Sequence, residues 1–214
     1  MCYTAQLETN GIFPYGLETF ATWDKVQPFP HFLQQSAAAR PVVPVVTSAR
    51  RDRFQTMRWL MVPPWVTTSD KFPSLKIWTA NARIEELRAK PLYAPLVEAN
   101  RCVVLFTGFY EWRHEENGNK TKYRILLADN EPMLLPGLYR TGIIDDEPYT
   151  SCTVCTMEAR GVMRYVHNST LRQPVVLQVK DADLWLDAAV SFETARKRTL
   201  EAEASERFVP DPPL

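Results

Sequence analysis

The sequence predicts an α+β protein: a single β-rich domain with a mostly antiparallel, barrel-like sheet core and a few flanking helices. Short segments rich in β-branched and aromatic residues recur between turn signals, which is the pattern of strands. Candidate helices are fewer. The chain of 214 residues is 45% hydrophobic, with 17 Pro but only 7 Gly. We therefore expect a globular core that needs no disulfide or metal support.

Strands are expected wherever such a segment lies between turn signals: Cys2–Leu7, Val42–Val46, Phe54–Leu60, Cys102–Phe106, Phe109–Arg113, Lys122–Leu127, Met133–Tyr139, Ser151–Met157 and Pro174–Val179. The clearest hairpin joins Phe109–Arg113 to Lys122–Leu127. Its turn contains Asn117 and Gly118, a pair that adopts the positive φ values of a tight turn. The strand period of two then puts Phe109, Glu111 and Arg113 on one face.

Helices are expected at Gly16–Lys25, Ile84–Arg88, Asp181–Ala188 and Phe192–Ser205. The last has a thin apolar stripe formed by Ala195, Leu200 and Ala204. Residues 210–214 form a Pro-rich, non-helical tail. Because there is no internal repeat, low-complexity tract or linker, we expect residues 1–214 to form one domain.

Composition narrows the functional classes. No basic segment followed by an apolar run opens the chain, and no apolar stretch is long enough to span a bilayer. We therefore expect a cytoplasmic protein with no membrane partner. The 25 Lys and Arg balance the 25 Asp and Glu, so any contact with nucleic acid must come from a local basic face.

Four cysteines in a cytoplasmic chain indicate reduced thiols rather than a disulfide framework. Cys152 and Cys155 form a C-x-x-C motif, which raises redox or metal use. Residues three apart in a strand point to opposite faces, however, and no second Cys/His pair has metal-ligand spacing. We expect neither a metal nor another cofactor.

Cys2 carries the most chemical information. Removal of Met1 would leave a terminal cysteine with an α-amine and a thiol on adjacent carbons. The amine condenses with an aldehyde to a Schiff base, and the thiol closes onto the imine to form a thiazolidine ring. Ring closure is intramolecular, which lowers its barrier. Near neutral pH both groups are already partly in their reactive forms.

Three further positions have side chains suited to assist. Glu111 lies among large aromatic residues, where burial would raise its pKa and allow proton transfer; the alternative is an exposed carboxylate on a half-buried strand. Asn81 and Arg83 form a polar island that could orient a hydroxyl and grip a phosphate. His167 has the pKa of a natural proton shuttle, but taken in isolation the sequence favours a structural histidine at this position.

Together these residues resemble the SOS-response-associated peptidase family, whose members shield abasic sites in single-stranded DNA. The resemblance runs from Cys2 to about Leu186. Its motifs are Met1-Cys2, the Trp59-to-Trp65 segment, Asn81-Ala82-Arg83-x-Glu85, Arg101-Cys102 leading to Gly108-Phe109-Tyr110-Glu111-Trp112, and His167 followed by Arg172-x-Pro174. Each motif is weak, but their order and spacing are specific.

The resemblance implies a covalent mechanism. Cys2 would form the Schiff base and then the thiazolidine with the aldehyde of an open abasic sugar, leaving a DNA–protein crosslink. Glu111 would move protons during ring opening and imine formation. Asn81 would position the terminal residue and the sugar, and His167 would assist proton transfer.

The resemblance also implies contacts with DNA. Arg83 and Arg172 would hold the phosphates that flank the lesion, and Trp65 would lie near displaced bases, where stacking contributes about 1–3 kcal/mol per base. Such phosphate contacts are independent of sequence and sensitive to salt. The implied partner is single-stranded DNA with abasic sites. A monomer is the default expectation for a DNA-tracking domain of this size.

This chain departs from the family pattern at several positions. Tyr3 and Thr4 replace a Gly-Arg pair, so an early arginine is missing. Leu60 stands where Gly usually follows the tryptophan. Four residues separate His167 from Arg172, where many members have one. These differences affect the expected grip on DNA more than the reactive centre.

Two other hypotheses remain open from the sequence. Cys2 could be the terminal nucleophile of an autoprocessing or thiol peptidase, assisted by His167 and Glu111. Alternatively, the protein could bind single-stranded DNA without chemistry. The covalent sensor is the leading hypothesis.

Overall fold

The computed structural model describes residues 3–12, 14, 17–23 and 28–213. The strands within these residues are β1 (Thr4–Leu7), β2 (Phe32–Ser36), β3 (Val42–Thr47), β4 (Arg50–Trp59), β5 (Asn81–Arg83), β6 (Arg101–Phe106), β7 (Gly108–His114), β8 (Lys120–Leu127), β9 (Met133–Ile144), β10 (Glu147–Glu158), β11 (Arg172–Pro174) and β12 (Phe208–Asp211). The α-helices are α1 (Gly161–Val166), α2 (Ala182–Leu186) and α3 (Phe192–Glu201).

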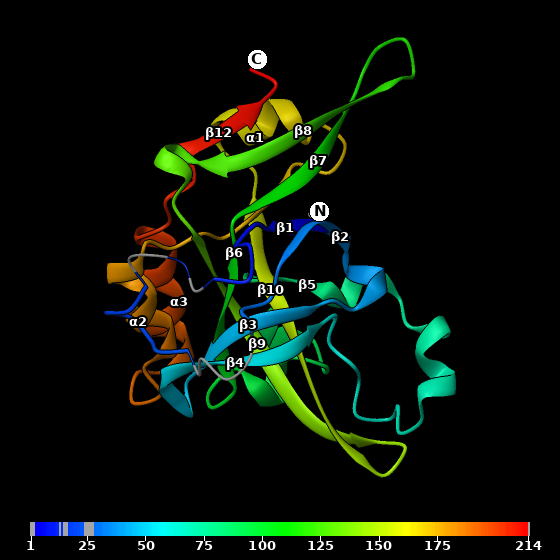
Figure 1. Ribbon diagram of the computed structural model, residues 1–214, viewed down its shortest axis with the longest axis vertical. Coiled ribbons are helices and arrows are strands. Elements are labelled where there is room, and N and C mark those ends of the chain that lie inside the picture. The colour runs from blue at the N-terminus through cyan, green and yellow to red at the C-terminus, as the bar shows by residue number, and fades with distance from the viewer. Residues whose placement is uncertain (1–2, 13, 15–16, 24–27, 214) are drawn as a thin grey trace.

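A closed barrel forms the centre of the molecule (Figure 1). Its strands follow one another in the order β10, β4, β3, β6 and β9, and β9 pairs back to β10 to close the ring. All of these pairs are antiparallel except β4 with β10. Short strands β5 and β11 are added to β10. The α+β fold class with a barrel-like, mostly antiparallel core is confirmed.

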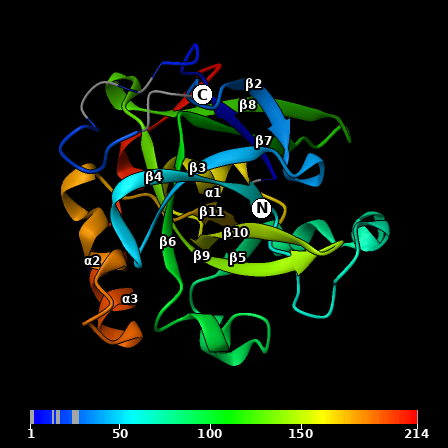
Figure 2. The same ribbon diagram turned by 60° about the horizontal axis from the view of Figure 1, so that its bottom comes forward.

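A second sheet lies against one end of the barrel and has the strand order β12, β8, β7, β1, β2. Its β7–β8 hairpin forms at the predicted turn, where Gly118 has a φ of +82° but Asn117 does not have the positive φ expected of the pair. Gly108 opens β7 where a Cβ atom would meet the end of the Leu126 side chain at 2.8 Å and the Ile125 carbonyl oxygen at 3.0 Å, so a larger residue would displace Leu126 and crowd the backbone of β8. Helices α2 and α3 cover the side of the barrel (Figure 2).

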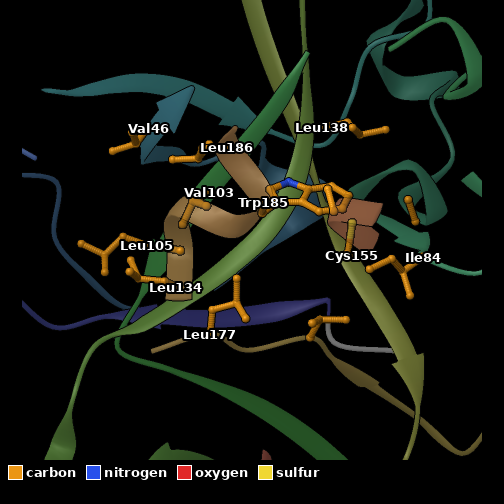
Figure 3. Packing of buried hydrophobic residues seen from close by; sticks show 14 of the residues in the cluster. Val46, Ile84, Val103, Leu105, Leu134, Leu138, Cys155, Leu177, Trp185 and Leu186 are labelled. Carbon is orange, nitrogen blue, oxygen red and sulfur yellow. The ribbon is translucent and has the colours of Figure 1, made fainter. Parts of the chain in front are cut away.

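Two large clusters of buried apolar residues fill the described structure, beside a small third one of Val62, Val66 and Ile144. One large cluster includes Trp59, and the other surrounds Trp185 (Figure 3). Successive strand residues point to opposite faces, so β10 contributes to both clusters. Cys152 belongs to the Trp59 cluster and Cys155 to the Trp185 cluster, as the period of two predicts. Burial raises the pKa of both thiols, which are inert in this setting.

Arg101 fixes the helical side of the molecule to the barrel. Its side chain is fully buried at the start of β6, and its guanidinium donates to the carbonyl oxygens of Trp185 at 2.7 Å, Val97 at 3.0 Å and Val190 at 2.9 Å, and also to that of Asp187. One planar cation thus satisfies the carbonyl groups where α2 ends. The arginine of the Arg101-Cys102 motif is therefore structural.

The expected strands match observed ones except the last. Only Pro174 of Pro174–Val179 lies in a strand, the end of β11. Strands β2, β5 and β12 were not predicted from the sequence; β12 falls partly within the Pro-rich tail, which is non-helical as expected. These short edge strands take their conformation from a neighbouring strand rather than from their own residue pattern.

The helix predictions were less accurate. The described part of Gly16–Lys25 forms turns closed onto the Leu17 carbonyl and a bridge from Thr22 to Arg53, so a helix is wrong there. Leu17 and Ala21 lie four residues apart, as on one face of a helix, and both are buried although the segment is not helical. Ile84–Arg88 is a turn leading into a 3-10 helix rather than an α-helix.

The two C-terminal helices exist but are shorter than expected. Helix α3 ends at Glu201, before Ala204. Helix α1 was missed because its six residues are too few for a periodic signal. Within the described residues, no helix has the length and apolarity needed to cross a membrane.

Candidate functional site

Glu111 lies in the middle of β7 with its side chain turned inward. The alternation of the strand buries Phe109 and Glu111, while Tyr110 and Trp112 on the other face are only half-buried. Glu111 is 5% exposed, and this burial raises the pKa of its carboxyl group to about 7. Of the two alternatives that the sequence left open, the buried carboxyl group is the one observed, and a carboxyl group with this pKa exchanges protons near neutral pH.

His167 ends helix α1 and is 4% exposed. Its Nδ1 lies 2.7 Å from the Arg172 carbonyl oxygen, its Nε2 lies 3.1 Å from the Thr170 hydroxyl, and Nε2 is 3.8 Å from Oε2 of Glu111. Burial is the main cause that lowers the pKa of His167 to about 4, so the ring is neutral at pH 7. The structure thus brings together two of the predicted residues from distant parts of the chain.

Asn81 opens β5 and is 4% exposed. It lies opposite Val154 of β10, and the buried indole of Trp59 donates through Nε1 to the adjacent Ala80 carbonyl oxygen at 3.0 Å. Tyr93 also donates through its hydroxyl to the Asn81 carbonyl oxygen at 3.4 Å. The tryptophan of the Trp59-to-Trp65 motif thus supports the backbone that presents Asn81.

The two predicted phosphate ligands differ in their surroundings. Arg83 has a half-exposed side chain and pairs with Glu86 at 2.9 Å. Arg172 is 11% exposed and donates to both carboxylate oxygens of Glu85, at 3.1 and 2.9 Å, and to the Thr156 carbonyl oxygen at 2.8 Å. Any phosphate that reaches Arg172 must therefore compete with Glu85.

These ion pairs connect the β5 side of the site with His167. Glu85 follows β5, and Arg172 begins β11; both short strands are paired with β10. The Arg172 backbone in turn accepts from His167, which faces Glu111. Successive contacts thus run from Glu85 to Arg172, from Arg172 to His167, and from His167 to Glu111. They join three segments that lie far apart in the sequence.

An open groove of about 690 Å³ runs beside Asn81. Trp65 and Trp78 line it with 67% and 60% of their surfaces exposed. Arg83 and Lys90 contribute cations whose side chains are more than half exposed, and both pair with Glu86, which also lines the groove, at 2.9 and 3.2 Å. Two accessible indoles beside two cations form a surface suited to bases and phosphates of a single strand. Trp78 was not singled out from the sequence, although its place just before the Asn81 motif was a usable signal.

Leu60 explains one departure from the family pattern. It is buried and has a φ of +113°, in the region that glycine adopts without strain. Its backbone N–H donates to the Cys152 carbonyl oxygen at 3.1 Å, which joins the end of β4 to β10. The backbone conformation at this position is thus one that favours glycine, the residue that the resemblance leads one to expect here, and this chain adopts it with leucine.

Cys2 lies outside the described residues, so the structure describes Glu111, His167 and Asn81 without it.

Among the described residues, no group of three or more His, Cys, Asp and Glu side chains is arranged to hold a metal ion. His31 is structural: its Nδ1 accepts from the backbone N–H groups of Thr9 at 3.0 Å and Asn10 at 2.9 Å.

Comparison with known families decides the relationship. The sequence model described as "SOS response associated peptidase (SRAP)" matches residues 18–210. The chain belongs to the SRAP family. The matched range contains Asn81, Glu111 and His167 and begins after Cys2.

Curated relatives of this SRAP protein carry the name abasic site processing protein. YoqW of Bacillus subtilis is 26% identical over 152 residues, which cover 71% of this chain and 65% of that protein. HMCES of Gallus gallus is 32% identical over 171 residues, which cover 69% of this chain and 49% of that protein. The chain thus spans less than two thirds of the length of these relatives.

Solved structures have the same SRAP-type fold. A protein of Bacteroides thetaiotaomicron superposes with a TM-score of 0.84 at 24% identity, covering 98% of this chain and 90% of the other. A protein of Bordetella bronchiseptica gives a TM-score of 0.77 at 21% identity, covering 98% of each chain. At these identities the likeness concerns the fold alone.

Proposed function

We propose that this protein recognises abasic sites in single-stranded DNA and captures them covalently through Cys2 once Met1 is removed. Membership of the SRAP family and the names of the curated relatives support a role at abasic sites. The observation that carries the proposal is the buried pair of Glu111 and His167, 3.8 Å apart, with pKa values shifted in opposite directions. Such a pair is suited to proton transfer at neutral pH.

The proposed reaction has two bond-forming stages. The Cys2 amine adds to the aldehyde carbon of the open sugar, and loss of water gives a C=N bond. The thiol sulfur then adds to that carbon, the π electrons pass to nitrogen, and the thiol proton ends on nitrogen. The product is a thiazolidine ring, and no oxidant or reductant is needed.

Glu111 is the proposed acid and base for these stages. With a pKa of about 7, its carboxyl group is protonated in part of the molecules and ionised in the rest at neutral pH. It can therefore protonate the departing hydroxyl when water is lost and accept a proton when the sugar ring opens. Neutral His167 offers an imidazole nitrogen beside it, and Asn81 would orient the sugar.

The groove is the proposed path of the DNA strand. Trp65 and Trp78 would stack on unpaired bases, while Arg83 and Lys90 would contact the backbone. Stacking accepts every base, and contacts with phosphate carry no sequence information, so we expect little sequence preference. Arg172 is the second proposed phosphate contact, which requires displacement of Glu85.

Intact-protein mass after mixing with single-stranded DNA that carries one abasic site tests the proposal. We expect a mass increase equal to the oligonucleotide minus one water. Cys2→Ala should abolish the stable adduct. Cys2→Ser keeps the amine and should give only a Schiff base that must be trapped by borohydride. An unshifted mass for the parent protein, after its first tryptic peptide has shown that Met1 is absent, would refute the proposal.

Binding to intact single-stranded DNA separates recognition from chemistry. Trp78→Ala should weaken this binding about tenfold, because stacking contributes roughly 1–3 kcal/mol per base. The matched control is Trp112→Ala, which removes a half-buried indole from the outer face of β7. Equal losses in the two variants would contradict the groove as the path of the strand.

The word peptidase in the family description supplies the competing outcome. Hydrolysis of a peptide that depends on Cys2, without any adduct on abasic DNA, would favour the peptidase hypothesis. DNA binding that persists unchanged in Cys2→Ala, again without an adduct in the parent, would favour binding alone.

A further inference from the structure

The segment 168–171, by which this chain departs from the family pattern, contacts the proposed site directly. We propose that it acts as a clamp in which Thr170 and Asn168 are positioning residues, holding His167 in its Nδ1–H form with Nε2 directed at Glu111. The inference rests on the function proposed above, because the clamp matters for the reaction only if His167 takes part in it.

The tautomer of His167 follows from its two hydrogen bonds. The Arg172 carbonyl oxygen, 2.7 Å from Nδ1, can only accept, so Nδ1 carries the proton and donates it. In the neutral ring Nε2 then has a lone pair, to which the Thr170 hydroxyl donates at 3.1 Å. The two bonds hold opposite sides of the ring, which fixes its plane and directs the Nε2 edge toward Glu111 at 3.8 Å.

Asn168 attaches this segment to the strand that carries Glu111. Its Oδ1 accepts from the backbone N–H of His114 at 3.0 Å, and its Nδ2 donates to the His114 carbonyl oxygen at 2.8 Å. The side chain thus replaces a strand partner at the end of β7. His114 is three residues beyond Glu111 and Asn168 directly follows His167, so this contact joins the two halves of the pair.

A second contact holds helix α1 to β7. The Arg113 guanidinium lies 3.8 Å from the centre of the Tyr165 ring and donates to the Tyr165 carbonyl oxygen. Cation–π attraction and a charge-assisted hydrogen bond therefore act at the same place. The contacts of Arg113 with Tyr165 and of His114 with Asn168 lie on the same stretch of β7 and secure α1 close to the Glu111–His167 pair.

The position of Leu171 indicates that the segment is constrained. Leu171 is more than one third exposed and has a φ of +51°, a conformation that costs energy for a residue other than glycine. Its backbone N–H donates to the His167 carbonyl oxygen at 3.1 Å, and its own carbonyl accepts from Ala159 at 2.8 Å. The first bond closes residues 167–171 into a tight loop, and the second attaches that loop to Ala159, the residue after β10.

Substitution of Thr170 tests the inference. Thr170→Val removes the hydroxyl at constant shape and should slow adduct formation about tenfold, the equivalent of one lost hydrogen bond. Affinity for intact single-stranded DNA should stay within about twofold, since positioning acts on the reaction rather than on the groove. Thr170→Ser should restore the rate. Thr141→Val, on the exposed part of β9, is the matched control.

Proton–nitrogen correlation spectra of the His167 ring provide a readout that does not depend on the reaction. In the parent protein we expect a protonated Nδ1 and an unprotonated Nε2. The Nε2 resonance should move in Thr170→Val and return in Thr170→Ser. A protonated Nε2 in the neutral parent protein, or an Nε2 resonance unmoved by Thr170→Val, would overturn the inference.

The two proposals fail in different ways. A parent protein that forms no adduct refutes the proposed function, while the ring spectra still decide the clamp. A parent protein that forms the adduct, together with a Thr170→Val variant that reacts at the same rate, refutes the positioning role alone. Asn168→Ala should slow the adduct to a similar degree as Thr170→Val, and an unchanged rate there would remove Asn168 from the clamp.

Discussion

Arg101 and Glu111 are both buried side chains of charged residues, yet they serve the molecule in different ways. Arg101 is fully buried at the edge of the barrel, where backbone carbonyl groups from several segments accept its N–H groups. Glu111 lies on the second sheet beside a neutral imidazole, and its pKa is raised to about 7. Burial that fixes a charge through hydrogen bonds stabilises a fold, whereas burial that makes a charge unfavourable creates a group that exchanges protons.

The largest effect is expected on the structural side of this comparison. Arg101→Leu leaves buried carbonyl groups without their donor and should lower the free energy of unfolding by about 3–5 kcal/mol. For a chain of this size the melting temperature should fall by roughly 10 °C. Thermal unfolding followed by circular dichroism measures both quantities.

Arg51→Leu is the control for this experiment. Arg51 pairs with Asp183 of α2 at 2.6 Å, but both side chains are largely exposed. An exposed ion pair contributes about 1 kcal/mol or less, so this variant should unfold close to the parent. Equal losses in the two variants would mean that the Arg101 hydrogen bonds do not stabilise the fold as described.

Glu111→Gln tests the raised pKa of Glu111 through the dependence of stability on pH. Because the folded pKa of about 7 lies above the ordinary value of 4.5, the folded protein binds more protons than the unfolded chain between these values. The Glu111 contribution to stability therefore falls as pH rises from about 4.5 to 7. Relative to the parent, the free energy of unfolding of Glu111→Gln should rise across this range, on the order of 3 kcal/mol.

Glu203→Gln is the matched control for Glu111→Gln. Burial also raises the pKa of Glu203, whose carboxylate accepts from the Ser205 hydroxyl at 2.7 Å and lies 3.7 Å from Arg160. The stability of this variant should change with pH in the same direction. Adduct formation should slow by about 10²-fold or more in Glu111→Gln and stay unchanged in Glu203→Gln. Equal rates in the two variants would contradict the special role of Glu111.

His167→Gln should produce the opposite dependence on pH. The folded pKa of about 4 lies below the ordinary value of 6.5, so the unfolded chain binds more protons between these values. The His167 contribution to stability therefore rises with pH from about 4 to 6.5. Relative to the parent, the free energy of unfolding of His167→Gln should fall across this range. A flat difference in denaturant titrations would show that His167 titrates normally in the folded state.

The smallest effect concerns the strained position at the end of β4. At ordinary buried positions alanine is more stable than glycine, but Leu60 has a φ of +113°. The free energy of unfolding of Leu60→Gly should therefore exceed that of Leu60→Ala by about 1 kcal/mol. Leu105, fully buried in β6, is the control position, where Leu105→Ala should be more stable than Leu105→Gly. If the alanine variant is the more stable one at both positions, Leu60 carries no backbone strain.

Local chemistry explains which features could be predicted from the sequence. The β7–β8 hairpin depends on a local turn, in which Gly118 supplies the positive φ and the Asn117 side chain accepts from the Asn119 backbone N–H at 2.9 Å. The opposite orientation of Cys152 and Cys155 follows from the strand period alone. The short strands β2, β5 and β12 could not be predicted in this way, because pairing with a distant strand decides their conformation.

The sequence by itself determined the β-rich class, most of the strands, the division of the β7 side chains between two faces, and the residue types available for proton transfer and DNA contact. Which face of β7 is buried was decided by the tertiary structure. Only the tertiary structure decided that Glu111 and His167 lie 3.8 Å apart and that Glu85 forms an ion pair with Arg172. It also decided that Trp78 and Trp65 line the same groove. The hydrogen bonds of Thr170 with His167 and of Asn168 with His114 were likewise found only in the tertiary structure. The physical reason is that pKa values, ion pairs and grooves arise from long-range packing, which a local residue pattern does not encode.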